Sequence, residues 1–332
     1  MKDTIKRLVE AYAPSGFEDQ IRSIIREEIA GLADSTRVNR LGSLIAIKKG
    51  SGGKSSKRVM LSAHMDEIGL MVTHVDANGF ARVTNIGGVR PMNCVGGRVV
   101  FADGSVGVIH FDRLDDLSKP PSMEHLYIDT GARDKASSRV KVGDAAAFQR
   151  PFANMGERMA AKSMDDRIGC AILIETMRRL VRTPHEVHFV FSVQEEIGTI
   201  GARTAGYEIN PDIAVAVDVT ATGDTPKALP MAVELGKGPA IKVQDAGMIA
   251  HTGVKELMIQ RAEESKMAYQ LEILRGGTTD AAAIQVAREG VPSGCLSIPC
   301  RYIHTPSETV DTRDVLRSVD LLLAILRKPI AI

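Results

Sequence analysis

Four largely apolar segments of this sequence run into residues of the kind that bind metal ions. The segments and the residues that follow them are 58–63 with His64, 187–193 with Glu195 and Glu196, 213–217 with Asp218, and 296–298 with His304. Short apolar runs bounded by turn residues predict buried strands. In open α/β sheets, ligands bind in the crevice at the carboxyl ends of the strands. The four segments therefore predict one crevice lined by histidines and carboxylates.

The adjacent residues Glu195 and Glu196 strengthen this prediction. Two neighbouring carboxylates repel each other and are difficult to remove from water, so such a pair at the end of a buried strand requires positive charge beside it. A divalent cation can supply that charge, with one carboxylate as a ligand and the other free to move a proton. An isolated pair of glutamates is more often part of an exposed acidic loop. The three other strand ends outweigh that interpretation here.

A fifth segment, 163–169, places Asp165 and Asp166 at the expected start of an amphipathic helix. Acidic residues in a first helical turn can simply stabilise the helix dipole. Their position in the sequence between His64 and the glutamate pair favours a metal ligand instead.

Five motifs carry these residues, and their order is informative. They are AHMDEIG, SMDDRIG, QEEIGTIGA, AVDVT and CRYIHTPSE. In this order they resemble the tetrahedral (TET-type) dinuclear metallo-aminopeptidases, which are relatives of glutamyl aminopeptidase and some of which carry an endoglucanase label. The resemblance extends over essentially the whole chain.

The resemblance implies a set of metal ligands for two divalent ions per subunit. It implies that Asp165 bridges both ions, that His64 and Asp218 complete one site, and that Glu196 and His304 complete the other. Imidazole and carboxylate ligands without thiolate suit zinc, cobalt or manganese.

The resemblance also implies two further roles near the ions. Glu195 is expected to be the general base, and Asp66 is expected to be the carboxylate that holds the ring of His64. Residues two apart in an extended chain lie on the same face of a strand, so the spacing of His64 and Asp66 fits this arrangement.

The wide separation of His64 and Asp165 in the sequence predicts an inserted domain. If both residues reach one metal site, the chain between them must leave the sheet and return. Within this stretch, Asn78-Gly79 and Asp103-Gly104 are each flanked by short strand-like runs. Both dipeptides are strong hairpin signals, so the insert is expected to be a small β-barrel or PDZ-like domain.

The resulting expectation is an α/β fold with two domains. A discontinuous catalytic domain, residues 1–67 plus 158–332, should have a mixed sheet between helix layers, as in zinc peptidases. The insert should span residues 68–157. The resemblance implies that the insert dimerises the chain and that dimers form a tetrahedral dodecamer with an inner chamber. Two local details are a capping box at 15–18 that opens a helix and a polar loop at 51–57.

Charge and composition exclude several classes of protein. The chain has 42 basic and 41 acidic residues, a formal net charge of +1, so a nucleic-acid partner is not expected. No apolar run is long enough for a membrane span, and the N-terminus lacks the apolar core of a signal peptide. The four cysteines form no CxxC pair and are expected to be free thiols in a reducing cytoplasm.

The predicted function is that of a metal-dependent aminopeptidase that removes N-terminal residues from peptides. One alternative is another amide hydrolase, such as a deacylase, on the same metal centre. Another is a glycoside hydrolase, in which a carboxylate pair serves as acid and base, although that reaction needs no metal. An interaction scaffold would explain only the insert. The glycine-rich segment 276–280 is expected to pack close to the site, and a role for His251 in lining the substrate pocket stays open.

Overall fold

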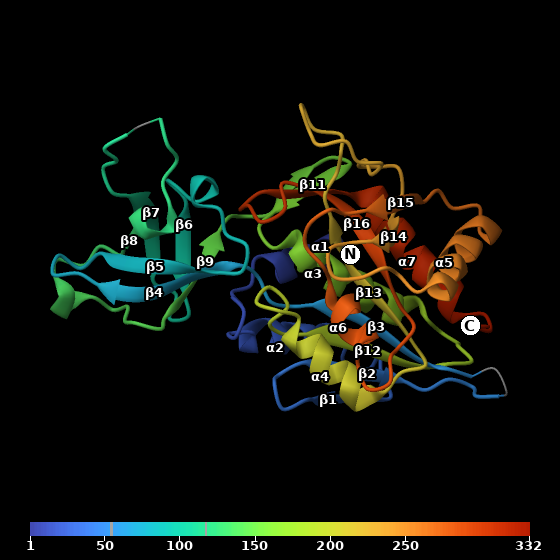
Figure 1. Cartoon of the computed structure of the whole chain (residues 1–332). Helices are drawn as coiled ribbons and strands as arrows, with labels where there is room; N and C mark the ends of the chain where they lie inside the picture. Colours follow the sequence, from blue (N-terminus) through green and yellow to red (C-terminus); the bar gives the residue numbers. More distant parts are fainter. Residues whose placement is uncertain (54–55, 117) are drawn as a thin grey trace.

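The computed structural model describes residues 1–53, 56–116 and 118–332. These residues form a large body with a central sheet and a smaller β-barrel beside it, on the left in Figure 1. The polar loop predicted at 51–57 contains Lys54 and Ser55, which lie outside the described residues.

The large body is built on a mixed sheet. Across the sheet, the strands are β1 (Ser35–Val38), β2 (Leu44–Lys48), β12 (Glu186–Ser192), β3 (Arg58–His64), β13 (Ile213–Thr220), β16 (Ser293–Arg301), β17 (Glu308–Asp311), β11 (Arg158–Ala161) and β10 (Ala153–Met155). Two more strands extend it, since β14 (Ala240–Gln244) pairs with β16 and with β15 (Gln270–Ile273). The neighbours β12, β3, β13 and β16 are parallel, so their carboxyl ends share one edge.

Helices cover both faces of this sheet. The core on one face includes residues of α1 (Lys2–Val9), α2 (Asp19–Glu28), α3 (Met164–Arg179), α5 (Thr252–Glu264) and α7 (Thr312–Leu326). The core on the other face includes residues of α4 (Ile200–Ile209) and α6 (Asp280–Gln285). This arrangement confirms the predicted α/β fold with a mixed sheet between helix layers.

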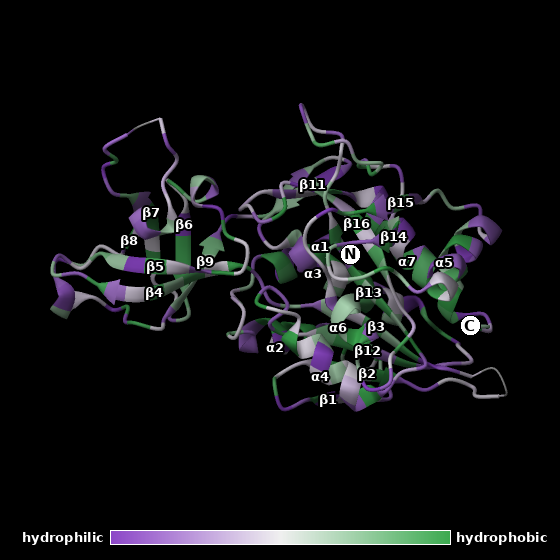
Figure 2. Cartoon of the chain, in the orientation of Figure 1, coloured by the Kyte–Doolittle hydropathy of each residue, from purple (hydrophilic) through white to green (hydrophobic). Residues whose placement is uncertain are grey.

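The central strands are apolar on both sides because each side meets a helix layer. In β3, Val59 and Leu61 belong to one core, while the intervening Met60 belongs to the other. Figure 2 shows the result as a band of hydrophobic strands inside a polar exterior. The expectation that the helix beginning near residue 163 is amphipathic is wrong, because α3 packs against β3, β13, α1 and α7 and is buried on nearly all sides.

The chain between β3 and β10 forms the barrel. Its six strands close in the order β4 (Gly69–Val75), β5 (Ala81–Ile86), β8 (Leu126–Asp129), β7 (Val106–Phe111), β6 (Arg98–Phe101) and β9 (Ala145–Gln149). Three short 3-10 helices, η1 (Pro91–Asn93), η2 (Met123–His125) and η3 (Lys135–Ser137), lie between the strands. Strands β4 and β5 pair across Asn78-Gly79, and β6 and β7 pair across Asp103-Gly104, as predicted. The barrel has a hydrophobic core of its own.

Two other expectations concern the whole chain. Among the described residues, no helix has both the length and the hydropathy that crossing a membrane requires. The four cysteines, Cys94, Cys170, Cys295 and Cys300, are buried free thiols.

Candidate metal centre

The predicted ligand residues converge at the carboxyl edge of the central sheet. His64 is the last residue of β3, and Asp218 lies near the end of β13. Glu195 and Glu196 follow β12, and His304 lies in the turn between β16 and β17. Because these strands are adjacent in the sheet, residues that are far apart in the sequence come within contact distance.

Asp165 lies between the two histidines. Its Oδ1 is 3.0 Å from Nε2 of His64, and its Oδ2 is 3.3 Å from Nε2 of His304. The same Nε2 of His304 is 3.1 Å from Oε2 of Glu196, and Nε2 of His64 is 4.0 Å from Oδ1 of Asp218. One carboxylate thus faces two separate groups of ligand atoms.

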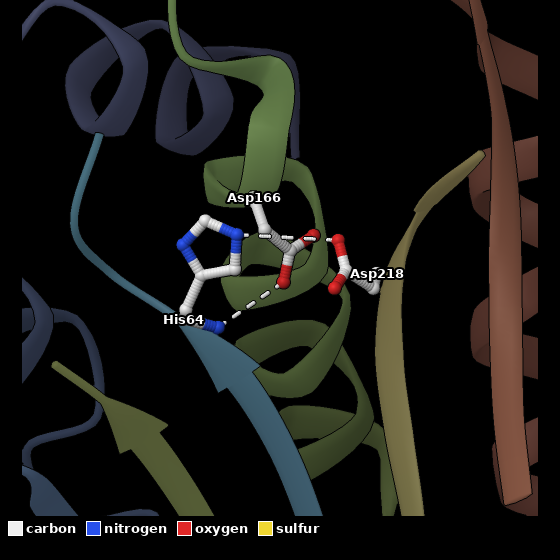
Figure 3. A group of neighbouring side chains, drawn as sticks. All are labelled: His64, Asp166 and Asp218. Carbon is white, nitrogen blue, oxygen red and sulfur yellow. Dashed lines mark hydrogen bonds and ion pairs between the residues drawn. The ribbon is translucent and has the colours of Figure 1, made fainter. Parts of the chain in front are cut away.

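Two overlapping groups of side chains have the spacing of a metal site. In each group, one nitrogen or oxygen atom per residue lies within 4.8 Å of the others. The first group contains His64, Asp165 and Glu196, and the second contains His64, Asp166 and Asp218 (Figure 3). The second group includes Asp166, which is not in the ligand set that the resemblance implies.

The contacts of Asp166 show that it supports the backbone of the site. Its Oδ2 accepts a hydrogen bond from the backbone N–H of His64 (3.2 Å), and its Oδ1 accepts one from that of Gly169 (3.1 Å). A Cβ atom at Gly169 would lie 2.4 Å from this carboxylate, which explains the glycine. Asp166 therefore ties the end of β3 to the start of α3 through both oxygens of its carboxylate.

Three buried carboxyl groups of the centre have too little positive charge beside them to offset their burial. Burial raises the pKa of the Glu195 and Asp218 carboxyl groups well above the usual range, and negative neighbours add to this effect. The pKa of Glu196 is also raised, by burial and by the charge of Asp165. For His304, burial lowers the pKa, but the contacts with Asp165 and Glu196 outweigh it and raise the pKa to about 11. A cluster of this kind favours a bound cation.

The donor atoms also suit divalent ions. Oε1 of Glu196 is buried and has no hydrogen-bond partner among the described residues. The nitrogen and oxygen donors of the cluster include no thiolate, a set that zinc, cobalt and manganese accept. The residues therefore fit a pair of such ions.

Asp66 lies beside the His64 ring and also makes contacts that the sequence did not predict. Its Oδ1 is 3.5 Å from Nδ1 of His64. The Asp66 carboxylate also accepts hydrogen bonds from the backbone N–H groups of Glu195 (3.0 Å) and Glu196 (3.2 Å), and from the hydroxyl of Ser15 (2.5 Å). Asp66 thus holds the backbone of the glutamate pair.

The prediction of a capping box at 15–18 is wrong, because Ser15 does not cap the helix. The Ser15 hydroxyl is committed to Asp66, and α2 begins after Glu18 without a side-chain cap.

Glu308 is a site residue that the sequence did not reveal. This buried carboxylate accepts hydrogen bonds from the backbone N–H of Asp165 (2.9 Å) and of His304 (2.8 Å). Glu308 therefore holds the backbones of two predicted ligands in position relative to each other. The only signal was a glutamate four residues after His304, which is indistinguishable in the sequence from an exposed one.

The centre opens into a pocket of about 650 Å³. Asp165, Glu195, Glu196, Asp218 and His304 line it. The wall also includes Gly276, Gly277 and Thr278, so the glycine-rich segment lies near the site as predicted. His251 instead is exposed at the start of α5 and is not among the residues that line this pocket.

Known proteins resemble this chain over nearly its full length. The sequence profile of M42 glutamyl aminopeptidases matches residues 42–321. The lysyl aminopeptidase of Pyrococcus furiosus is 35% identical over 98% of this chain and 96% of its own. A solved aminopeptidase from the archaeon Desulfurococcus kamchatkensis is 38% identical, with a TM-score of 0.93 over 98% of this chain and 94% of its own. The TET1 peptidase of Pyrococcus horikoshii, described as assembling into a tetrahedron or a large octahedral shell, is 31% identical, with a TM-score of 0.89 over 98% and 99%.

Proposed function

Because this chain belongs to the family of M42 glutamyl aminopeptidases, it is an aminopeptidase that hydrolyses peptide bonds, and we propose that the histidines and carboxylates of its pocket perform this reaction with two divalent metal ions. The observation that carries the proposal is the position of Asp165 between His64 and His304. The family and its relatives favour this activity over a deacylase and a glycoside hydrolase.

We assign the ligands of the two ions as follows. Asp165 is shared, His64 and Asp218 belong to one ion, and Glu196 and His304 belong to the other. When bound, such a pair of ions lowers the pKa of a water molecule and stabilises negative charge on the scissile carbonyl oxygen. The contacts of Asp165 and the raised pKa values of Glu196 and Asp218 support this assignment. Zinc, cobalt and manganese are the candidate ions.

Glu195 is the proposed general base. Its carboxylate lies 3.9 Å from Nε2 of His64, and the side chain lines the pocket. Burial raises the pKa of its carboxyl group in the pocket without ions, so the ionised form that a general base requires depends on the positive charge of the two ions. Glu195 takes a proton from the attacking water and returns it to the departing amine. Asp66 keeps the Glu195 backbone in place for these transfers.

A comparison of free and blocked peptides tests this function. With added zinc, cobalt or manganese, we expect an oligopeptide with a free N-terminus to lose single residues in succession, while its N-acetylated counterpart stays intact. Mass spectrometry of the products over time gives the result. Release of acetate from the blocked peptide would favour the deacylase, and hydrolysis of a β-glucan would favour the glycoside hydrolase.

We propose that the barrel, which lies within residues 68–157, is a domain through which the chain associates; β10 at the end of this range pairs with β11 in the central sheet instead. The barrel has its own hydrophobic core, which is a property of an independent folding unit. Val106 and Val108, two apart on β7, are both exposed on one face of that strand. The related TET1 peptidase assembles into a tetrahedron or an octahedral shell. We propose dimers that build a dodecamer with the pockets facing an inner chamber, so that only unfolded peptides reach them.

The mass of the particle in solution tests the proposed assembly. We expect light scattering to give a mass well above the 35.8 kDa of one chain, at the value of a dimer or a dodecamer. Deletion of the barrel strands, residues 69–149, which leaves β10 of the central sheet in place, should give a smaller particle. A monodisperse monomer with full activity, or cleavage of folded proteins, would contradict the chamber while leaving the metal chemistry intact.

The cytoplasm is the proposed location. Four buried free thiols fit a reducing compartment, and fractionation of the source cells can check this.

A further inference from the structure

The barrel also contributes to the wall of the catalytic pocket. Gly88 and Arg90 lie in the segment 87–90, between β5 and η1, and they line the same pocket as Glu195 and His304. This segment thus brings residues of the barrel to the metal centre of its own chain.

The contact between this segment and the proposed ligands is tight. A Cβ atom built on Gly88 would lie 2.3 Å from Nδ1 of His304. One built on Gly87 would lie 3.1 Å from Oε2 of Glu196, and the φ of Gly87 is +73°. The two glycines therefore allow the backbone to pass directly against both side chains. The segment is a part of the site, and its position relative to the ligands is well defined.

The backbone of Arg90 is fixed by hydrogen bonds, whereas its side chain has no ion-pair partner among the described residues. Its carbonyl oxygen accepts hydrogen bonds from the N–H of Asn93 (2.9 Å) and from the thiol of Cys94 (3.3 Å), in the turn that begins η1. Its side chain is exposed, and no described residue forms an ion pair with it. Of the described residues that line the pocket, Arg90 is the only lysine or arginine.

The charge of Arg90 is not cancelled by the metal centre. If the proposed function holds, two divalent ions carry four positive charges, and four carboxylates carry four negative charges: those of Asp165, Glu195, Glu196 and Asp218. The rest of the wall contains neutral residues such as Val219, Leu274 and Ile303. A guanidinium in this setting binds a carboxylate with charge-assisted, often paired hydrogen bonds.

We propose that Arg90 is a specificity-determining residue that the barrel supplies to the pocket, and that it binds a carboxylate of the substrate peptide. This inference rests on the proposed function of the same pocket. The carboxylate has two sources, the side chain of an N-terminal aspartate or glutamate and the C-terminal carboxylate of a short peptide.

Matched substrate pairs measured on a set of variants test this role. The variants are Arg90→Ala, Arg90→Lys and the control Arg133→Ala, which removes an exposed arginine of the barrel that does not line this pocket. One substrate pair is the glutamyl and glutaminyl nitroanilides, which have similar shapes and differ in charge. The other is a tripeptide and its C-terminal amide. The ratio of kcat/KM within each pair does not depend on how much of a variant is folded.

We expect the unmodified enzyme to prefer the charged member of one pair by about tenfold or more. Arg90→Ala should reduce that preference to near unity, mainly through KM, Arg90→Lys should keep part of it, and Arg133→Ala should keep all of it. A loss confined to the nitroanilides identifies the side-chain carboxylate, and a loss confined to the tripeptides identifies the C-terminal one. If the unmodified enzyme cleaves all four substrates and Arg90→Ala leaves both ratios unchanged, the role of Arg90 is refuted. If the unmodified enzyme cleaves none of them, the proposed function fails instead.

Discussion

Glu195→Gln is expected to lower kcat by about 10²–10⁴-fold while the protein keeps its full metal content. Glutamine has nearly the shape of glutamate but cannot accept a proton, so only the proton transfer is removed. Asp66 binds the backbone N–H of Glu195 and not its side chain, so the substitution leaves that contact unchanged.

The neighbouring substitution Glu196→Gln is expected to behave differently. Oε2 of Glu196 lies 3.1 Å from Nε2 of His304, in the group assigned to one ion. This variant should therefore lose about one of the two ions proposed per subunit, since a carboxylate ligand is replaced by a weaker neutral one. Elemental analysis and kcat measured on both variants separate the two roles. Glu289→Gln, at an exposed site, is the control. Equal metal loss in the two variants would show that the assignment of base and ligand is wrong.

Removal of the divalent ions is expected to reduce peptidase activity to the limit of detection. Without them, the pocket holds several buried carboxylates that repel one another and no Lewis acid for the scissile carbonyl oxygen. Dialysis against a chelator, followed by addition of zinc, cobalt or manganese in turn, should abolish and then restore the activity.

Two controls complete the metal experiment. A chelator already saturated with zinc should leave the activity unchanged, because it removes no ion from the protein. Melting temperature should fall on metal removal and recover on addition, since an ion that binds only the folded state stabilises it. Undiminished hydrolysis by metal-free protein would refute the metal-dependent reaction and reopen the glycoside hydrolase alternative.

The sequence by itself determined the elements that depend on local patterns. The runs that form β3, β12, β13 and β16 are apolar because each strand is covered on both faces. Each run can therefore be recognised as a buried strand from its own residues. The ligand-type residues that follow them meet in space because parallel neighbouring strands end at one edge. The hairpins of the barrel follow from Asn78-Gly79 and Asp103-Gly104, whose turn preference is equally local.

Only the tertiary structure decided which carboxylates support the ligands. Asp166 and Glu308 accept hydrogen bonds from backbone N–H groups of segments far away in the sequence, including that of His64 and that of Asp165. Such a contact leaves no periodic pattern, because any residue supplies a backbone N–H group. The same reason explains the error at Ser15, whose local pattern predicts a helix cap although its hydroxyl contacts Asp66 instead.

The contact between the barrel segment 87–90 and the pocket was also decided by the tertiary structure alone. The sequence predicts an insert because His64 and Asp165 must meet, but an insert can point in many directions from the same two ends. Gly88 and Arg90 reach the pocket only because the barrel docks with the segment 87–90 against His304 and Glu196. Apolar runs and turn residues predict the fold of each body, whereas this docking depends on the close fit of particular side chains and glycines, which appears only when the chain is folded.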